Sequence, residues 1–350
     1  MFIVHLICSF TTGGAETMLV DIINEQIRIR HHVVLVVINN LVDENLLAQL
    51  DKKVQIYRIN RVPRSRNLWS LIRLNYLLYK LGADVLHSHD SVIAGMLFPV
   101  FRQKLCLTIH LENVSDKYLS FYKKLIAVSD IVKSDVENRT SLHVDLIYNG
   151  IVIDKILKKN DWQINGPFRI VVVSRLEHLV KGQHIMLEAL HSLVYEKKKN
   201  ITLDFIGEGS SKDYLNTLVD SYQLNDRVNF LGIRSREYVY GHLSQYDLLV
   251  QPSIHEGFGL TVVEAMIANL PVLVSGNGPV EIVAQGKYGY CFNSGDINDC
   301  VEKTVWIIDN YLTCKPIADN AAQYAKDKFS ICNTVRFYVQ LYDTMISHTI

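Results

Sequence analysis

Several features that the sequence lacks narrow what this chain can be. No apolar run approaches the roughly 18 residues that suggest a membrane-spanning helix. The 36 basic side chains balance 36 acidic ones, so the chain lacks the positive charge typical of a general nucleic-acid binder. Hydrophobic residues make up 49% of the 350 positions, which excludes a disordered or fibrous protein. The length suits two domains of ordinary size.

The cysteines form no CxxC pair. They are scattered singly and mostly among apolar neighbours, at Cys8, Cys106, Cys291, Cys300, Cys314 and Cys332. Such cysteines indicate reduced thiols in a reducing compartment. The apolar start, Phe2 to Phe10, has neither a basic region before it nor a small-residue cleavage site, so it predicts a buried first strand rather than a signal peptide.

Familiar phosphate and metal motifs are also missing. There is no GxxxxGK[ST] loop, and Gly207-Glu208-Gly209 lacks the third glycine of a dinucleotide fingerprint. No Asp-x-Asp is present, so no carboxylate pair for a metal–diphosphate complex is predicted. His87 and His89 have too few neighbouring ligands for a zinc site. We expect them to be two strand-end histidines, one pointing inward and one outward.

What the chain does have is short β-branched runs that alternate with helical patterns. Continuous apolar strands separated by helices predict parallel sheets covered on both faces. The expected strands are Phe2–Cys8, Val33–Ile38, Val54–Ile59, Val85–Leu86, Leu105–Ile109, Leu125–Val128 and Leu146–Ile147, then Arg169–Val173, Thr202–Ile206, Val228–Leu231, Leu248–Gln251 and Val272–Val274. The pattern restarts after a polar stretch at 158–167, so we expect two successive doubly wound α/β domains, with a ligand in the cleft between them.

The segment from Pro252 to Ala265 carries the strongest chemical signal. A strand is expected to end near Gln251, and a glycine-flanked loop leads into a helix that opens near Gly259. Such a helix start offers N–H groups to an anion. Glu256 in the loop and Glu264 in the helix could both accept hydrogen bonds from the hydroxyls of one ligand. The alternative is two solvated glutamates around a turn.

With seven residues between them, Glu256 and Glu264 resemble the Glu-x7-Glu element of the retaining GT-B fold glycosyltransferases of glycosyltransferase family 4. Other elements similar to that family follow in order along almost the whole chain. They are Gly13-Gly14-Ala15-Glu16, His110, Asn149-Gly150-Ile151 with Asp154, Ser174-Arg175-Leu176 with Lys181-Gly182, Gly207-Glu208-Gly209, Phe230-Leu231-Gly232, Pro271-Val272, and Gly278-Pro279 with Glu281. The resemblance implies a GT-B fold with two Rossmann-like doubly wound domains facing a cleft.

The resemblance also implies boundaries and residue roles. Residues 1–160 would form the acceptor-binding domain, residues 161–328 the nucleotide-sugar domain, and residues 329–350 a helix that crosses back to the first domain. The implied catalytic residues are His110, Arg175, Lys181 and Glu256. The implied donor site comprises Gly13, Gly14, Arg175, Lys181, Gly232, Glu256, Gly257, Phe258, Gly259, Leu260 and Glu264. The interval from Arg175 to Lys181 is one residue longer than is common in the family.

The resemblance also assigns a part of the donor to each of the charged site residues. Arg175 and Lys181 would neutralise the donor diphosphate, Glu264 would bind the ribose hydroxyls, and Glu256 would bind the sugar hydroxyls. No metal and no cofactor are expected, and a UDP-sugar would be the donor substrate. The acceptor would be a glycan or a lipid-linked hydroxyl in bacterial surface polysaccharide or lipopolysaccharide biosynthesis, with the enzyme in the cytoplasm. A sugar-nucleotide epimerase of the same fold and a non-catalytic partner subunit stay open as alternatives.

A basic stretch without any acid extends from Lys52 to Lys80. Its eight cations are Lys52, Lys53, Arg58, Arg61, Arg64, Arg66, Arg73 and Lys80, and it also holds Trp69. Leu68, Leu71, Leu74, Leu78 and Leu81 follow the period of a helix face. They could pack in the core, or the stretch could lie on the anionic inner face of the plasma membrane, and the two can coexist.

Overall fold

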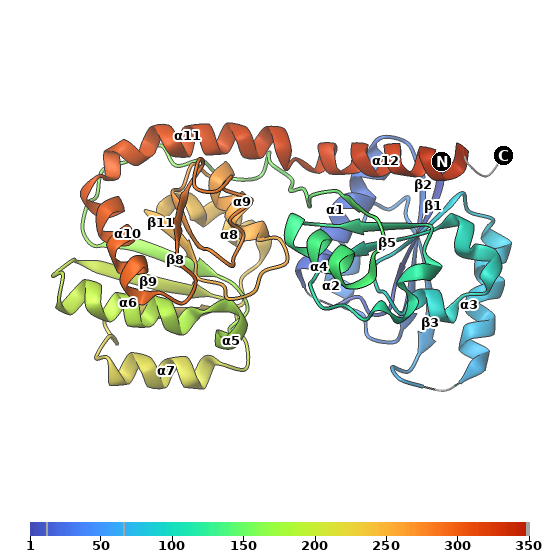
Figure 1. The fold of residues 1–350 in the computed structure, drawn as a ribbon, viewed down its shortest axis with the longest axis horizontal. Helices are drawn as coiled ribbons and strands as arrows, with labels where there is room; N and C mark the ends of the chain where they lie inside the picture. The colour runs from blue at the N-terminus through green and yellow to red at the C-terminus, as the bar shows by residue number, and fades with distance from the viewer. Residues whose placement is uncertain (12, 66, 348–350) are drawn as a thin grey trace. The chain divides into compact units, whose positions relative to one another are not determined.

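The computed structural model describes residues 1–11, 13–65 and 67–347 (Figure 1). The chain divides into two compact units. Residues Met1–Ile151 together with the helix Ile331–Ser347 form the first, and Val152–Ser330 form the second. Across the described residues, no helix is both long enough and apolar enough to cross a membrane.

The first unit is built on a seven-stranded parallel sheet. Its strands are β1 (Phe2–Ile7), β2 (His32–Asn39), β3 (Gln55–Arg61), β4 (Val85–Ser88), β5 (Leu105–Ile109), β6 (Lys124–Ala127) and β7 (Val144–Leu146), in the order β3-β2-β1-β4-β5-β6-β7. The central strands are buried because they are almost continuously apolar, as expected for a sheet with helices on both faces.

Helices and 3₁₀ turns connect these strands. They are α1 (Gly14–Arg28), α2 (Glu44–Leu47), α3 (Leu68–Leu81), η1 (Ile93–Met96), η2 (Pro99–Lys104), η3 (Asp116–Phe121) and α4 (Asp130–Thr140). The last helix, α12 (Ile331–Ser347), packs against α1 and β4. Its Tyr338 and Tyr342 are fully buried, and their hydroxyls hydrogen-bond to Thr108 and His87 of the sheet.

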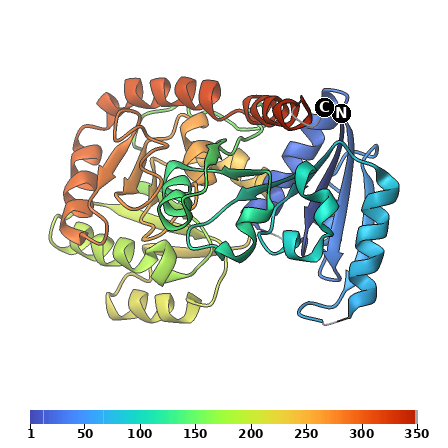
Figure 2. The same cartoon turned by 45° about the vertical axis from the view of Figure 1, so that its right-hand side comes forward.

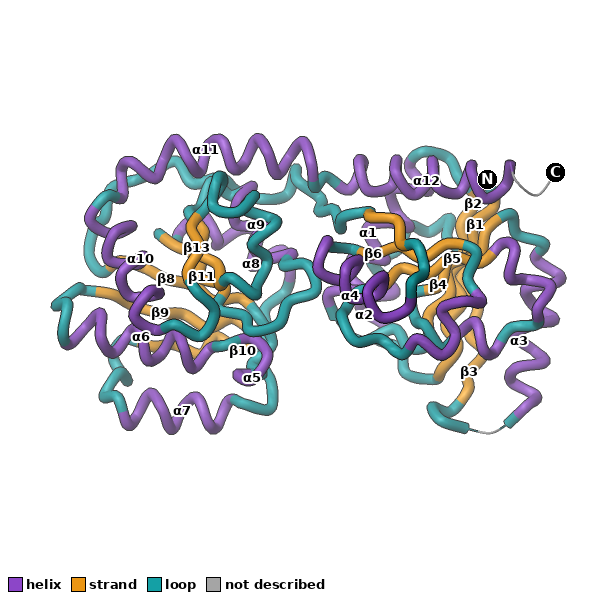
Figure 3. Tube along the Cα trace, viewed as in Figure 1, coloured by secondary structure: helices purple, strands orange, loops and turns teal. Residues whose placement is uncertain are grey.

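The second unit contains a six-stranded parallel sheet. Its strands are β8 (Phe168–Val173), β9 (Ile201–Ile206), β10 (Val228–Gly232), β11 (Leu248–Gln251), β12 (Val272–Ser275) and β13 (Tyr290–Phe292), in the order β10-β9-β8-β11-β12-β13. The helical segments are α5 (His178–Lys181), α6 (Gln183–Tyr195), α7 (Lys212–Ser221), α8 (Arg236–His242), η4 (Leu243–Gln245), α9 (Leu260–Ile267), α10 (Ile297–Asp309) and α11 (Tyr311–Lys328). Figure 3 shows helices on both sides of these strands.

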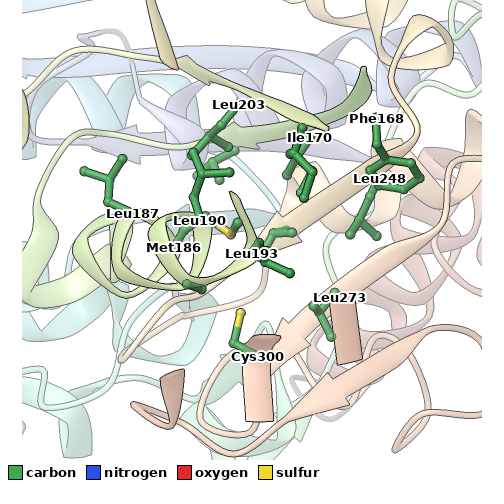
Figure 4. Close-up of a cluster of buried hydrophobic side chains, with 14 of the residues drawn as sticks. Phe168, Ile170, Met186, Leu187, Leu190, Leu193, Leu203, Leu248, Leu273 and Cys300 are labelled. Carbon is green, nitrogen blue, oxygen red and sulfur yellow. The ribbon is translucent and has the colours of Figure 1, made fainter. Parts of the chain in front are cut away.

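The core of the second unit lies between its sheet and the apolar face of α6. Met186, Leu190 and Leu193 of α6 contribute to it, together with Ile170 of β8 and Leu203 of β9 (Figure 4). All five side chains are almost completely buried. This packing fixes the ends of the strands from which the loops described below emerge.

The expectation of two doubly wound parallel sheets is confirmed, and the structure adds details that the sequence pattern did not show. Strand β13 was not anticipated, since its three residues, Tyr290–Phe292, include no β-branched side chain. Residues 152–160 pack with the second unit rather than the first. The cause is visible at Lys159, whose buried Nζ donates to the Tyr246 carbonyl at 2.7 Å and to Asp247 Oδ1 at 3.1 Å.

Of the two alternatives left open for the leucines of the basic stretch, packing in the core holds for only part of α3. Only Leu74, Asn75 and Leu78 of this helix are buried, whereas Leu68 is largely exposed. Asn67 caps the helix by accepting a hydrogen bond from the Trp69 amide. Arg66, one of the eight cations, lies outside the described residues.

Candidate active site

The loops that carry the predicted donor residues emerge at the switch point of the second sheet. Strands β8 and β11 are neighbours, but the chain leaves β8 toward β9 on one side and leaves β11 toward β12 on the other. In open α/β sheets, this reversal leaves a crevice at the carboxyl ends of the two strands, where ligands bind. Arg175 and Lys181 follow β8, and Glu256 follows β11.

Lys181 and Glu256 form an ion pair across these two loops. The Lys181 Nζ donates to Glu256 Oε1 at 2.9 Å, and the two side chains are 21% and 11% exposed. A partly buried pair of this kind holds both charges in fixed positions better than a solvated surface pair does. The extra residue between Arg175 and Lys181 therefore does not keep Lys181 away from Glu256.

The second carboxylate oxygen of Glu256 is also occupied. Glu256 Oε2 accepts hydrogen bonds from Gln251 Nε2 and Ser253 Oγ, each at 3.0 Å. The carbonyl of Ser253 in turn accepts a hydrogen bond from the buried hydroxyl of Ser275. Sequence reasoning missed Gln251 and Ser275 as supports, because each looks like an ordinary strand-end residue.

A close approach of the two loops brings Lys181 into position. The carbonyl of Val180 accepts from the amides of Ile254 and His255 at 2.9 and 3.1 Å. Gly182 has φ of +66°, and a Cβ added there would lie 2.0 Å from the Pro252 carbonyl oxygen. Only glycine fits this position without displacing backbone.

Arg175 is placed differently. Its side chain is 62% exposed, and its Nη1 lies 3.3 Å from Glu177 Oε1. Its carbonyl accepts a hydrogen bond from Gln183 Nε2 at 2.8 Å. The structure thus fixes the backbone of Arg175 against Gln183 of α6, while the largely exposed guanidinium group lies beside Glu177, where a ligand can recruit it.

Helix α9 brings Glu264 into the interior. This residue is buried, and its Oε1 lies 3.9 Å from Arg236 Nε of α8. Gly259, immediately before the helix, has φ of +96°, and a Cβ there would meet the Pro279 ring at 2.6 Å. Arg236 had no sequence signal, since it is 28 positions from Glu264 and lies in an unremarkable polar helix start.

Gly257, Phe258 and Leu260 surround the start of α9. The Phe258 ring is buried and packs edge-on against Phe329, with 5.6 Å between the ring centroids. This side chain therefore anchors the loop, and any ligand contact of Phe258 must come from its backbone. The first turn of a helix has N–H groups without intrahelical partners, which can bind an anion.

Gly232 ends β10 on the other side of β8. Its φ is +72°, and its carbonyl accepts from the Gly207 amide at 2.9 Å. A Cβ at Gly207 would lie 2.1 Å from the Ser174 carbonyl oxygen, so this glycine lets the loops after β8 and β9 pack together. The predicted nucleobase contact of Gly232 stays a prediction.

The first unit has a switch point of its own, between β1 and β4. Gly13 and Gly14 lie after β1, where Gly13 is the N-cap of α1 and Gly14 is its first residue. The carbonyl of Gly13 accepts from the amide and the hydroxyl of Thr17 at 3.0 and 2.8 Å. These glycines form a helix start, as predicted, and their donor contact remains a prediction.

His110 follows β5 and belongs to a cluster of four histidines. Its ring stacks on His89, with 5.8 Å between centroids, and His89 lies 4.4 Å from His87 by the same measure. His5 Nδ1 and His89 Nε2 are hydrogen-bonded at 3.0 Å. The expectation that His87 and His89 point to opposite sides was wrong, because both are buried on β4 and the segment that follows it.

Burial keeps these imidazoles neutral. It lowers the pKa of His110 and of His5 to about 4 and holds the pKa of His87 and of His89 well below the ordinary value. Among the described residues, His110 Nε2 is a buried nitrogen without a hydrogen-bond partner. His110 can therefore offer an uncharged nitrogen to a ligand at neutral pH.

The structure adds His5 to the two histidines weighed above as zinc ligands. One nitrogen each from His5, His87 and His89 lies within 4.8 Å of the others, a grouping that could hold a metal ion. Most of the nitrogens already have hydrogen-bond partners, however, and His89 Nδ1 is a buried nitrogen without one. The His87 nitrogens are hydrogen-bonded to the Tyr342 and Thr108 hydroxyls at 2.6 and 2.7 Å, and His5 Nε2 is hydrogen-bonded to Gln26 Oε1 at 2.8 Å. This pattern accounts for the cluster as a hydrogen-bonded part of the core.

Comparisons with known proteins identify the family of this chain. The family model for glycosyl transferases group 1 matches residues 154–328, which is half of the chain, and the model for glycosyltransferase family 4 matches residues 12–155. An uncharacterized glycosyltransferase of Methanocaldococcus jannaschii is 26% identical over 300 residues, covering 80% of this chain and 82% of that protein.

Two solved structures show the same fold. HepE of Anabaena, crystallised with UDP and glucose, has a TM-score of 0.81 at 21% identity and covers 97% of this chain and 99% of its own. The apo form of WaaB, a lipopolysaccharide outer core galactosyltransferase, has a TM-score of 0.77 at 17% identity, with 100% of both chains covered. The chain therefore belongs to the glycosyl transferases group 1 family and is a glycosyltransferase of GT-B fold.

Proposed function

We propose that this glycosyltransferase moves a hexose-type sugar from a nucleotide-diphosphate sugar, most simply a UDP-sugar, to a hydroxyl of a glycan or lipid-linked acceptor. The observation that carries the proposal is the Lys181–Glu256 pair at the switch point of the second sheet. A cation and a carboxylate held side by side match a ligand with a diphosphate next to sugar hydroxyls.

In this proposal, each of the site residues of the second unit contacts one part of the donor. Lys181 and Arg175 bind the diphosphate, and the amides that open α9 add to the positive potential. Glu256 accepts hydrogen bonds from the sugar hydroxyls, and the buried Glu264 accepts from the ribose hydroxyls. Backbone groups around Gly232 contact the nucleobase. Gly13 and Gly14 approach the phosphates through backbone N–H groups.

The transfer itself would retain the anomeric configuration. The bond between the anomeric carbon and the phosphate oxygen breaks, and the acceptor oxygen bonds to that carbon on the same face. The acceptor proton goes to the departing phosphate oxygen, so the products are the glycoside and a nucleoside diphosphate. The protein supplies positioning and charge stabilisation, with Arg175 and Lys181 balancing the charge that develops on the leaving group. His110 contributes a neutral imidazole toward the sugar.

Metal ions are not part of this proposal, since basic side chains and a helix start can supply the charge that a divalent cation would otherwise provide.

Two proteins of similar structure support the proposed nucleotide and the proposed biological role. HepE was crystallised with UDP and glucose, which favours UDP as the nucleotide. WaaB is a lipopolysaccharide outer core galactosyltransferase, which favours a role in bacterial surface polysaccharide synthesis, and we place that role in the cytoplasm.

A screen of nucleotide-sugars by thermal shift tests the proposal. A donor present at 100 times its Kd should stabilise the fold by about 2.7 kcal/mol, which is a clear rise in Tm. We expect UDP and at least one UDP-hexose to raise the Tm, and the free hexose to leave it unchanged. If no nucleotide-sugar and no nucleoside diphosphate changes the Tm, the proposed donor class is wrong. A change in sugar stereochemistry without any acceptor would instead indicate an epimerase.

A further inference from the structure

Helix α3 has an exposed apolar face that the chemistry above does not use. Its members are Leu68, Trp69, Ile72, Tyr76 and Tyr79, called the α3 face below. At 100° per residue they fall within an arc of roughly 100°. Trp69 is 75% and Tyr79 is 77% exposed, so these large side chains stand almost entirely in solvent.

The opposite side of α3 holds the helix in place. Leu74 and Leu78 are buried in the core of the first unit, and the helix packs against β3. Figures 1 and 2 both show α3 running alongside β3, the last strand at one edge of the sheet. The α3 face is thus a rigid surface that does not need to bury itself for the fold to form.

A neighbouring segment enlarges this apolar surface. The buried Asn75 side chain donates to the Met96 carbonyl at 2.9 Å and accepts from the Phe98 amide at 2.7 Å. Phe98 and Val100, which this contact holds beside α3, are both exposed. The surface therefore comprises a helix and an adjoining loop, each with large apolar side chains in solvent.

Two cations of the same helix flank the α3 face. Arg73 and Lys80 are exposed on the flank of the same helix, and Lys52, Lys53 and Arg64 are exposed within the acid-free stretch. Arg58 is the exception, because its guanidinium pairs with Glu44 at 2.6 Å. The cations beside the patch disfavour a second copy of it as the partner, since a symmetric dimer would bury the same patch of both chains and bring their positive charges near one another.

We propose that the α3 face and the 98–100 segment insert into the surface of an anionic lipid bilayer. Tryptophan and tyrosine favour the membrane–water interface, and the flanking lysines and arginines favour anionic headgroups. A helix anchored on one side and apolar on the other, with basic edges, is the arrangement of an interfacial helix. This inference rests on the proposed function, because it would bring the enzyme to a lipid-linked acceptor.

Vesicle co-sedimentation of the full chain, without any donor or acceptor, tests the inference. We expect binding to phosphatidylglycerol-containing vesicles at low salt and little binding to pure phosphatidylcholine vesicles. The double variant Ile72→Ser/Tyr76→Ser should lose binding. The control variant Leu312→Ser changes a largely exposed leucine on α11 of the second unit, and it should bind vesicles like the wild type.

Charge reversal separates the electrostatic part from the apolar part. Arg73→Glu/Lys80→Glu should weaken vesicle binding roughly tenfold or more, whereas Lys158→Glu/Lys197→Glu, which reverses two exposed lysines of the second unit, should not. Lipids brominated in their acyl chains should quench the wild-type tryptophan emission, and the quenching should be lost in Trp69→Phe.

Three results would overturn the inference. They are wild type that stays in the supernatant at low salt, binding that Ile72→Ser/Tyr76→Ser does not change, and a stable dimer that this double variant dissociates, which would make the face a protein interface. The assay contains no nucleotide-sugar, so its failure leaves the proposed function intact. Conversely, an α3 variant that no longer binds vesicles should still be stabilised by the donor.

Discussion

The Lys181 ammonium and the Glu256 carboxylate lie 2.9 Å apart, although 75 positions separate them in the sequence. Each belongs to a loop that leaves the carboxyl end of a central strand, and the loops touch through Val180, Gly182 and Pro252. Contacts within the protein itself therefore hold the two charges proposed to meet the diphosphate and the sugar. Such preorganisation lowers the cost of assembling the site during the reaction.

The loop contact that places Lys181 depends on Gly182. We predict that Gly182→Ala destabilises the protein by about 1–3 kcal/mol, because alanine is strained at positive φ and its Cβ would overlap the Pro252 carbonyl. Urea unfolding measures this change. Gly241→Ala is the matched control, since a Cβ there meets no atom within 4 Å. Equal stability of both variants would show that the loop approach is not constrained.

Variants of Glu264 and Glu256 should have different effects, because the two residues are proposed to contact different parts of the donor. Glu264→Ala should weaken the binding of free UDP, because the ribose is common to UDP and to the UDP-sugar. Glu256→Ala should leave UDP affinity nearly unchanged and mainly reduce turnover of the intact donor. Isothermal titration with UDP and a donor-turnover assay check both statements. The ribose assignment fails if Glu264→Ala binds UDP as tightly as the wild type.

Transfer should survive chelation. The site proposed here neutralises the diphosphate with Arg175, Lys181 and the start of α9, so excess EDTA should leave the rate of donor turnover unchanged. The measurement is the initial rate with and without EDTA, followed by addition of Mg²⁺ or Mn²⁺. Complete loss of activity that either ion restores would contradict the metal-independent mechanism.

The histidine cluster makes stability depend on pH. Burial lowers the pKa of His5 and of His110 to about 4, whereas a histidine in the unfolded chain titrates near 6.5. Between these values the unfolded chain binds more protons, so the free energy of unfolding should fall as the pH drops from about 6.5 to about 4. Each neutral imidazole contributes at most about 1.4 kcal/mol per pH unit.

Urea unfolding at pH 7 and at mildly acidic pH measures this dependence. His5→Leu should show a shallower loss than the wild type, because one fewer proton is taken up on unfolding. A slope that His5→Leu leaves unchanged would show that this imidazole does not oppose protonation in the fold.

Sequence patterns predicted the features of this molecule that depend on residues close together in the chain. Twelve of the strands could be located because each is a short, mostly apolar run between helical patterns, and the Glu256–Glu264 spacing pointed to the family. Contacts between distant segments were invisible. No local sequence pattern indicates that His5 contacts His89, which is 84 positions away, or that Arg236 lies near Glu264. Neighbouring strands and helices of the folded chain create both contacts.

Helix α3 shows a second limit. Its apolar residues cover more than one side, so their period could not decide which side is buried. Burial is set by β3 and by the Asn75 contacts with 96–98, which lie elsewhere in the chain. The leucine pattern therefore indicated a helix face but left its burial open, and the structure leaves Leu68 outside the core.

The central claim is that Lys181 and Arg175 neutralise the diphosphate of a nucleotide-sugar. The measurement that tests it most directly is release of UDP from the donor selected in the thermal-shift screen, for wild type, Lys181→Ala, Arg175→Ala and the control Lys197→Ala. We predict that kcat/KM falls roughly ten- to a thousandfold in either site variant, with an unchanged fold, and stays at the wild-type value in the control. Donor kinetics that remain unaltered in both Lys181→Ala and Arg175→Ala would contradict the account.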